Sequence, residues 1–207
     1  MTTLTNTLAT RHEPFDAEAR AADATAVSGF WVYLMTDLVL FASLFATYAV
    51  LHASTFGGPS GSDIFHMPLV LAETLILLTS SFTCGLAVVA ARAGGARRTA
   101  AWLVATLVLG AAFVAIEVSE FASLVRLGDG PSRSAFLSSY FTLVGTHGLH
   151  VFIGLVWIVA LIAVVLRKGL TRSVLRKLVL FSMFWHFLDL VWIFIFTVVY
   201  LMGVSIV

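Results

Sequence analysis

The residues best suited to chemistry are a histidine and a carboxylate inside a long hydrophobic stretch. His186 and Asp189 lie three residues apart in the segment Trp185-His-Phe-Leu-Asp-Leu-Val-Trp192. On a helix, this spacing places both side chains on one face. Ionisable groups cost roughly 2.5–3.5 kcal/mol each at the centre of a membrane helix, so they normally face protein or water. Such a pair marks either a functional site or a tie between helices.

The composition around this segment is that of a membrane protein. The 207 residues are 60% hydrophobic and 11% charged, whereas soluble domains are about 45–50% apolar and about 25% charged. A soluble enzyme is therefore excluded. The net charge is +1, and no basic patch of the kind that binds nucleic acid is present. The single cysteine, Cys84, provides neither a disulfide nor a Cys/His metal cluster.

Five apolar stretches have the length of about 20 residues that a membrane-spanning helix needs. Short connections between them predict an all-α fold, a polytopic membrane bundle. Residues 1–28 are polar and lack the apolar core of a signal peptide. We expect a poorly ordered cytoplasmic tail there and a transmembrane domain at 29–207. The five helices are expected at about 29–51, 69–91, 100–125, 137–166 and 178–204.

Basic residues are distributed unequally between the two sets of loops. Ten lie in the amino tail and in the second and fourth connections, whereas only Arg126 and Arg133 lie on the opposite side. Loops rich in lysine and arginine stay in the cytoplasm. The sequence therefore predicts a cytoplasmic amino terminus and a carboxyl terminus on the outer side of the membrane.

Each of the five stretches carries at least one ionisable residue. A single acid in the first stretch, Asp37, follows Tyr33 by one turn. It can serve as a proton-relay carboxylate or as a tie to another helix, and both interpretations stay open. The other stretches contain, in order, Glu73; Glu117 and Glu120; His147 and His150; and His186 and Asp189.

The predicted orientation assigns these groups to different depths. Asp37 and His186 are expected on the cytoplasmic side of the midplane, with Asp37 in the cytoplasmic third. His150 and Asp189 are expected near the middle, where they can pair across helices. The remaining four belong to the outer half, where Glu73 can meet Glu117 or Glu120. The carboxylates are therefore not expected to form one compact metal box.

Two kinds of metal centre compete with structural roles for these histidines and carboxylates. Haem in helical bundles is usually held by histidines from two facing helices. His147 and His150 lie on one helix, so they provide few of the ligands that such a site needs. Glu117 and Glu120 lack the Glu-x-x-His partner motif of di-metal carboxylate bundles. We therefore expect interhelical hydrogen bonds and no cofactor or metal in this chain.

The last stretch is also rich in aromatic residues. We expect these side chains to face lipid and partner proteins instead of lining a cofactor pocket. They are Phe181, Phe184, Trp185, Phe187, Trp192, Phe194 and Phe196.

Several motifs resemble subunit III of haem–copper terminal oxidases. The segments at residues 57–65 and 130–137 are further similar to the ubiquinol-oxidase branch, of cytochrome bo type. Five helices fit that branch, because the longer cytochrome c oxidase version has two more at its start. The resemblance runs from about residue 29 to residue 203. Its main motifs are Tyr33-Leu-Met-Thr-Asp37-Leu-Val-Leu-Phe41, Gly145-Thr-His-Gly-Leu-His150-Val and Trp185-His-Phe-Leu-Asp-Leu-Val-Trp192.

The resemblance implies an accessory subunit of a respiratory complex in the bacterial inner membrane, with a periplasmic carboxyl terminus. Haem and copper would belong to subunit I, beside which this chain would pack together with subunits II and IV. The complex would take electrons from ubiquinol, reduce oxygen to water and pump protons. Subunit III would support assembly, bind phospholipid in a cleft between its helices, and maintain proton uptake and durable turnover.

The resemblance also implies roles for particular residues. Asp37 stands where the family has an acid near the proton-uptake side. Glu117 stands where longer members commonly have glutamine. The remaining candidates match polar interhelical positions of the family: Glu73, Glu120, His147, His150, His186 and Asp189.

Three other classes of membrane protein share some of these features. A cytochrome c oxidase-type subunit III differs in the electron donor of its complex. A self-contained cytochrome or metal enzyme would need iron or copper bound to this chain alone. A proton-coupled transporter would use the intramembrane acids, but transporters usually contain repeats with broken helices, and the sequence shows neither.

Overall fold

The fold is all-helical, as predicted. The computed structural model describes residues 2–205, with side chains described for residues 23–61 and 64–203. Five helices are long and apolar enough to cross a membrane, which confirms the expected number. The elements in order are α1 (Thr2–Leu51), α2 (Gly61–Ile64), α3 (Met67–Arg92), α4 (Ala96–Arg126), α5 (Ala135–Lys168), α6 (Arg172–Ile195), the π-helix η1 (Phe196–Leu201) and α7 (Met202–Ser205).

Helix α1 begins at Thr2 and not near residue 29. Residues 17–24 contain five alanines, and alanine is the best helix former. Extending an existing helix is also far easier than nucleating one. The candidate membrane span found among the residues with described side chains runs from Asp23 to Leu51, and the predicted depth of Asp37 in the membrane stays a prediction. By contacts the chain divides into two units, Met1–Leu38 and Val39–Val207. A domain boundary at residue 28 stays a prediction.

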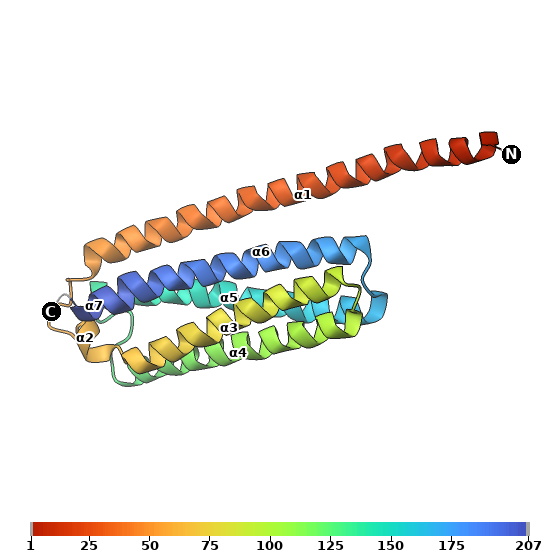
Figure 1. The fold of residues 1–207 in the computed structure, drawn as a ribbon. Helices are drawn as coiled ribbons and strands as arrows, with labels where there is room; N and C mark the ends of the chain where they lie inside the picture. Colours follow the sequence, from red (N-terminus) through yellow and green to blue (C-terminus); the bar gives the residue numbers. More distant parts are fainter. Residues whose placement is uncertain (1, 206–207) are drawn as a thin grey trace. The chain divides into compact units, whose positions relative to one another are not determined.

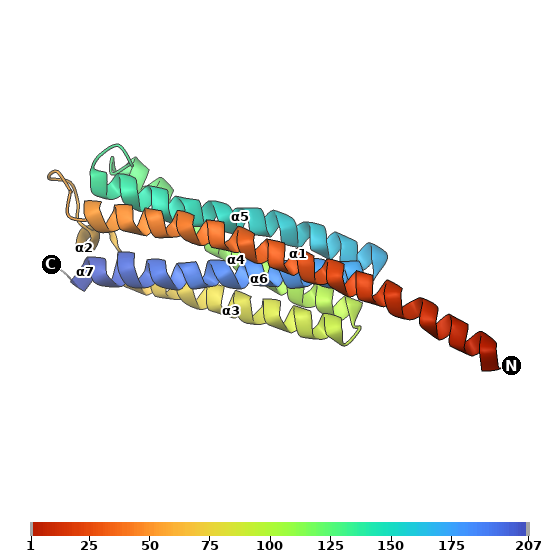
Figure 2. The ribbon, with the colours of Figure 1, turned by 90° about the horizontal axis from the view of Figure 1, so that it is seen from above.

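The second unit is built around a closed ring of four antiparallel helices. Helix α3 packs on α4 and α6, and α5 packs on the same two helices, as Figures 1 and 2 show. Hydroxyl caps begin two of these helices: Ser134 accepts a hydrogen bond from the backbone N–H of Leu137 at 3.1 Å, and Thr171 accepts one from Val174 at 3.4 Å. These caps satisfy backbone N–H groups that have no partner within the helix.

Two tryptophans of α6 fix that helix against α3. The indole N–H of Trp185 donates to the Ser80 hydroxyl at 3.1 Å, and that of Trp192 donates to the Thr74 hydroxyl at 3.1 Å. Both rings are buried. An indole N–H needs a partner when it is removed from water, so the two bonds set how far α6 is shifted along α3.

The expectation that the aromatic residues of α6 face lipid and partners is wrong for most of the large rings. Trp185, Trp192, Phe181 and Phe184 are buried, whereas Phe194 is exposed. The face of α6 that packs against the other three helices is wide enough to bury these large aromatic side chains. Within a membrane, close packing and interhelical hydrogen bonds replace the hydrophobic effect as the reason for burial.

Two glycines make room for the indole of Trp185. A Cβ at Gly110 of α4 would lie 2.9 Å from the ring, and one at Gly154 of α5 would lie 2.7 Å from it. Real Cβ contacts are essentially never that short. The backbones of α4 and α5 therefore approach this ring more closely than any other residue type would allow.

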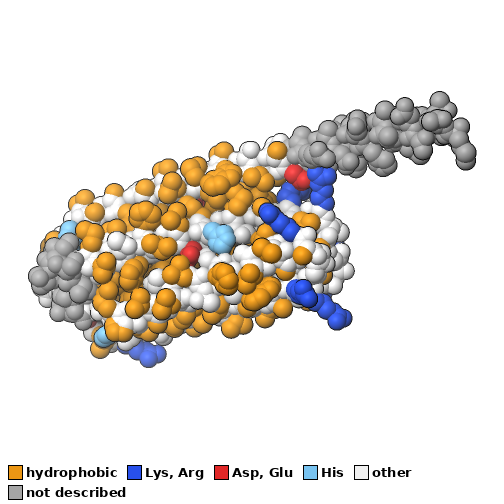
Figure 3. Space-filling model, in the orientation of Figure 1, with side chains coloured by type: hydrophobic (Ala, Val, Ile, Leu, Met, Phe, Trp, Pro, Cys, Tyr) orange, Lys and Arg blue, Asp and Glu red, His pale blue; other side chains and the backbone are white. Residues whose placement is uncertain are grey.

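Basic residues gather at one end of the four-helix ring. Residues 92–98, between α3 and α4, contain three arginines, and residues 167–177, between α5 and α6, contain five basic residues. Figure 3 shows several of these blue side chains at the end opposite to α2, next to a broad apolar band. The opposite end carries Arg126 and Arg133. This arrangement keeps most of the charge at the two ends of the ring.

A glycine substitution tests the packing around Trp185. Gly154→Ala should lower the thermal midpoint of the purified chain, because the new Cβ collides with the indole. Gly148→Ala, on the same helix, is the matched control, since a Cβ there meets nothing within 4 Å. The control should be neutral or stabilising, by about 0.5–1 kcal/mol, because alanine favours a helix interior over glycine. Equal midpoints for the two variants would contradict this account of the packing.

Candidate functional site

Three carboxylates meet inside the bundle. Glu73 of α3 and Glu117 and Glu120 of α4 each offer an oxygen within 4.8 Å of the others. The predicted proximity of Glu73 to the acids of α4 is confirmed. However, the expectation that no compact group of carboxylates forms is wrong for these three residues. Their convergence depends on the antiparallel alignment of α3 with α4, which sequence spacing alone does not fix.

This carboxylate trio is poorly compensated by hydrogen bonds. Glu73 is 0% exposed and Glu117 is 3% exposed, and within the described part of the chain their carboxylate oxygens have no hydrogen-bond partner. Like charges at this spacing repel strongly in a medium of low dielectric constant. Simultaneous ionisation of all three carboxylates is therefore unfavourable.

Two phenols lie on the same side of the bundle as the trio. The hydroxyl groups of Tyr140 and Tyr200 are 3.1 Å apart and hydrogen-bonded, and both rings are buried. Both phenols interact electrostatically with Glu117 and Glu120. Phe65, after α2, covers them, with its ring centroid 4.7 Å from that of Tyr200. The two buried phenols are therefore the polar groups that interact with the trio from α5 and the π-helix.

His147 occupies an aromatic enclosure. Its ring is 0% exposed, and its centroid lies 5.2 Å from that of Trp192, 5.9 Å from Phe113 and 6.3 Å from Phe41. Neither ring nitrogen has a hydrogen-bond partner among the described residues. The Nδ1 of His150 instead lies 2.8 Å from the carbonyl oxygen of Thr146. These surroundings do not fit a haem held by this chain, because rings enclose one imidazole and a backbone carbonyl engages the other.

His186, in the segment 185–192 of α6, makes a polar contact with α3. The hydroxyl of Ser81 lies 3.1 Å from Nδ1 of His186, and Asp189 interacts electrostatically with His186. His186 is exposed, whereas Ser81 is buried and Asp189 is intermediate. This serine was not identified from the sequence, because a lone serine in an apolar stretch carries no signal of its partner. The predicted pairing of Asp189 with His150 stays a prediction.

Asp37 belongs to the amino-terminal unit and has a local partner. The phenol of Tyr33, one turn earlier on α1, forms a hydrogen bond with its carboxylate. The hydroxyl of Thr36 bonds to the backbone carbonyl of Tyr33 at 2.6 Å. The helical spacing of Tyr33 and Asp37 read from the sequence is therefore matched by a direct contact.

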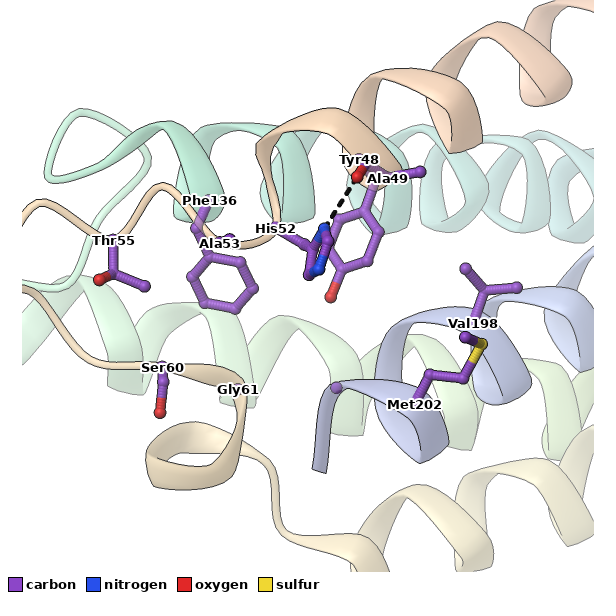
Figure 4. Close-up of a pocket in the computed structure, with 11 residues that line it drawn as sticks. Tyr48, Ala49, His52, Ala53, Thr55, Ser60, Gly61, Phe136, Val198 and Met202 are labelled. Atoms are coloured by element: carbon purple, nitrogen blue, oxygen red, sulfur yellow. Dashed lines mark hydrogen bonds between the residues drawn. The ribbon is translucent and has the colours of Figure 1, made fainter. Parts of the chain in front are cut away.

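A cavity of about 330 Å³ lies at the α2 end of the bundle. Figure 4 shows side chains from the end of α1, including Tyr48 and His52, opposite Val198 and Met202. The Tyr48 hydroxyl donates to the carbonyl of Val199 in the π-helix at 3.4 Å. None of the eight residues predicted from the sequence lines this cavity. Four separate stretches of the chain assemble it, at residues 48–55, 60–61, 136 and 198–203, so no single stretch of sequence could have indicated it.

Comparison with known proteins assigns a family to this arrangement. Residues 16–204 match the family model of cytochrome c oxidase subunit III. The chain belongs to this family. The resemblance recognised from the sequence motifs is therefore confirmed, and a multi-pass membrane subunit of an oxidase complex accounts for the five apolar helices.

Relatives in the family span nearly the full length of the chain. It is 57% identical over 198 residues to cytochrome bo(3) ubiquinol oxidase subunit 3 of Pseudomonas aeruginosa, covering 95% of each chain. It is 47% identical to quinol oxidase subunit 3 of Bacillus subtilis, covering 86% of this chain and 88% of the relative. It is also 46% identical to cytochrome c oxidase subunit 3 of Bacillus sp. strain PS3, covering 84% of each.

A neutral substitution in the carboxylate trio tests its electrostatics. Glu117→Gln should leave the thermal midpoint of the subunit III chain unchanged or raise it, because the amide keeps the shape and removes like-charge repulsion. Thr106→Val on the same helix is the contrasting variant. It removes a hydroxyl that lies 2.9 Å from the Thr83 hydroxyl. Because Thr83 keeps its hydrogen bond to the Ser80 carbonyl, the cost should be about 0.5–1.5 kcal/mol. A larger loss from Glu117→Gln would show that an attractive interaction depends on the ionised carboxylate.

Proposed function

We propose that this chain is the non-catalytic subunit III of a proton-pumping haem–copper quinol oxidase that passes electrons from ubiquinol to oxygen. The observation that carries the proposal is the 57% identity to the Pseudomonas ubiquinol oxidase subunit, which covers 95% of both chains. The partners are subunits I, II and IV. Haem and copper belong to subunit I, and membrane phospholipid binds to the complex.

The contribution of this chain is structural and electrostatic. The described side chains form interhelical hydrogen bonds, such as those of Trp185 and Trp192, which hold a rigid bundle in the membrane. Glu73, Glu117, Glu120, His147, His150, His186 and Asp189 serve as polar interhelical residues. The role of such a bundle is to support assembly of the catalytic subunit and to keep it stable during turnover.

Asp37 is the proton-uptake-side carboxylate of this proposal. A carboxylate in a membrane-spanning helix can bind and release a proton if a partner stabilises it, and Tyr33 supplies a hydrogen bond. In this mechanism, Asp37 helps to sustain the supply of protons to the catalytic subunit. It takes no part in the electron transfer itself.

The orientation follows from the distribution of charge. The end of the four-helix ring with residues 92–98 and 167–177 faces the cytoplasm of a bacterial cell, because basic loops stay on that side. The end with α2 and the carboxyl terminus then faces the periplasm. The amino terminus lies in the cytoplasm.

A cytochrome c oxidase-type subunit III is the second candidate, because the relative from Bacillus sp. strain PS3 carries that name at 46% identity. The two candidates differ in the electron donor of the whole complex. Oxygen consumption by the purified complex with ubiquinol, and none with reduced cytochrome c, would support the quinol-oxidase assignment. The opposite preference would replace it with the second candidate.

Native mass spectrometry of the tagged chain, extracted in mild detergent, tests the accessory role. We expect one copy of this chain in a complex with a much larger polypeptide that carries haem. A monomer or homo-oligomer would favour the transporter class instead. Haem or metal mass on the isolated chain would indicate a self-contained cytochrome or metal enzyme.

Replacing Asp37 tests the proton-supply role. In the intact complex, Asp37→Asn should leave the haem spectrum and the initial rate unchanged, but it should shorten the active lifetime during continuous turnover several-fold or lower the pumping ratio. Asp129→Asn, the same change in the loop after α4, is the matched control and should match the unsubstituted complex. Unchanged oxygen consumption and pumping by Asp37→Asn over many turnovers would exclude this role.

A further inference from the structure

His186 is an ionisable residue exposed in the middle of a membrane-spanning helix. It lies fourteen residues after Arg172 and fifteen before Leu201, the two ends of the candidate span. At 1.5 Å per residue, the side chain is about 20 Å from either end of that span. An imidazole cannot reach a membrane surface over such a distance, unlike a long lysine or arginine near a helix end.

The exposed histidine is part of a hydrogen-bonded group. Its Nδ1 contacts the buried hydroxyl of Ser81, and Asp189, three residues later on α6, interacts electrostatically with the imidazole. The Oδ1 atom of Asp189 has no hydrogen-bond partner in the described part of the chain. The contact through Nδ1 anchors the ring to α3 and leaves Nε2 available to a group outside this chain.

Apolar side chains surround this polar group. We call this surface the α3–α6 face. Figure 3 shows a histidine beside an acidic side chain within the apolar band. Hydrocarbon chains of lipid offer neither donors nor acceptors, so contact with lipid here would leave polar atoms without partners. The α3–α6 face consists of His186 and Asp189 with the exposed residues Leu78, Phe82, Leu190 and Ile193.

We infer that the α3–α6 face docks a transmembrane helix of another subunit, which presents a hydrogen-bonding side chain to Nε2 of His186. The partner helix has an apolar surface to cover Phe82 and Leu190, with a hydroxyl, amide or carboxyl group at the depth of the imidazole. Such polar pairs hold membrane helices together and fix their register. This inference rests on the proposed function, because it requires a complex of several membrane subunits.

Site-specific photo-crosslinking in the intact complex locates the partner. A photoreactive residue at Phe82, which is 67% exposed, should crosslink to another subunit, with the attachment point in a transmembrane helix. The same probe at Val108 of α4, which is 61% exposed, measures the background at an apolar position without an exposed ionisable neighbour. Lipid adducts alone at both Phe82 and Leu190 would overturn the docking inference.

A substitution separates docking from folding. His186→Leu should leave the thermal midpoint of the isolated chain unchanged or higher, because leucine suits a lipid-exposed position, yet it should reduce retention of the chain in the complex several-fold. Thr142→Leu is the matched control: its hydroxyl bonds within its own helix, to Ser138, so retention should not change. Full retention of His186→Leu would show that Nε2 makes no contact needed for docking.

The two experiments also distinguish this inference from the accessory role itself. If native mass spectrometry finds the haem-bearing complex but Phe82 and Leu190 capture only lipid, the accessory role stands and the docking face lies elsewhere. If no complex forms, the proposed function fails first. Crosslinks from Phe82 to a second copy of this chain would replace the partner subunit with a homo-oligomer and overturn the inference as stated.

Discussion

The register between α3 and α6 is the constraint on which the rest of the bundle depends. It is set by two hydrogen bonds from buried indoles, Trp185 to Ser80 and Trp192 to Thr74. Neither indole can turn to water inside a membrane, so sliding one helix along the other would break both bonds at once. The ring of Trp192 also packs edge-on against Phe113 at 4.7 Å, which extends the same constraint to α4.

The placement of the buried acids follows from this register. Once Trp192 is fixed beside Thr74 and Phe113, the next turn of α4 brings Glu117 to the level of Glu73. The carboxylate trio is therefore a consequence of how the tryptophans pack, although the trio itself is electrostatically unfavourable. Close packing in the centre, where Trp185 lies against Gly110 and Gly154, holds the helices in the alignment that buries these acids.

The sequence predicted the number of spans, the polar residue on each of them and the family, because these depend on composition and on residues close together in the chain. It did not predict the start of α1, since a polar but alanine-rich segment can be either a tail or a helical extension. It also failed for the aromatic face of α6 and for the partner of His186. Both features depend on which side of a helix meets its neighbours. The spacing of apolar residues cannot identify that side when nearly every position is apolar.

Polar side chains in this bundle differ in how completely the chain satisfies them. Trp185 and Trp192 have partners on α3 and are buried, whereas His186 has one nitrogen engaged and remains exposed. A self-sufficient membrane protein has no reason to keep an imidazole at mid-membrane depth on its outer surface, because the cost is borne without a matching contact. An accessory subunit does have a reason to keep such a polar group. Its core must be stable alone during insertion, while its docking surface must be polar enough to reject lipid and select one partner. A subunit of a larger assembly is therefore expected to combine a core with satisfied hydrogen bonds and an α3–α6 face whose polar groups need a partner.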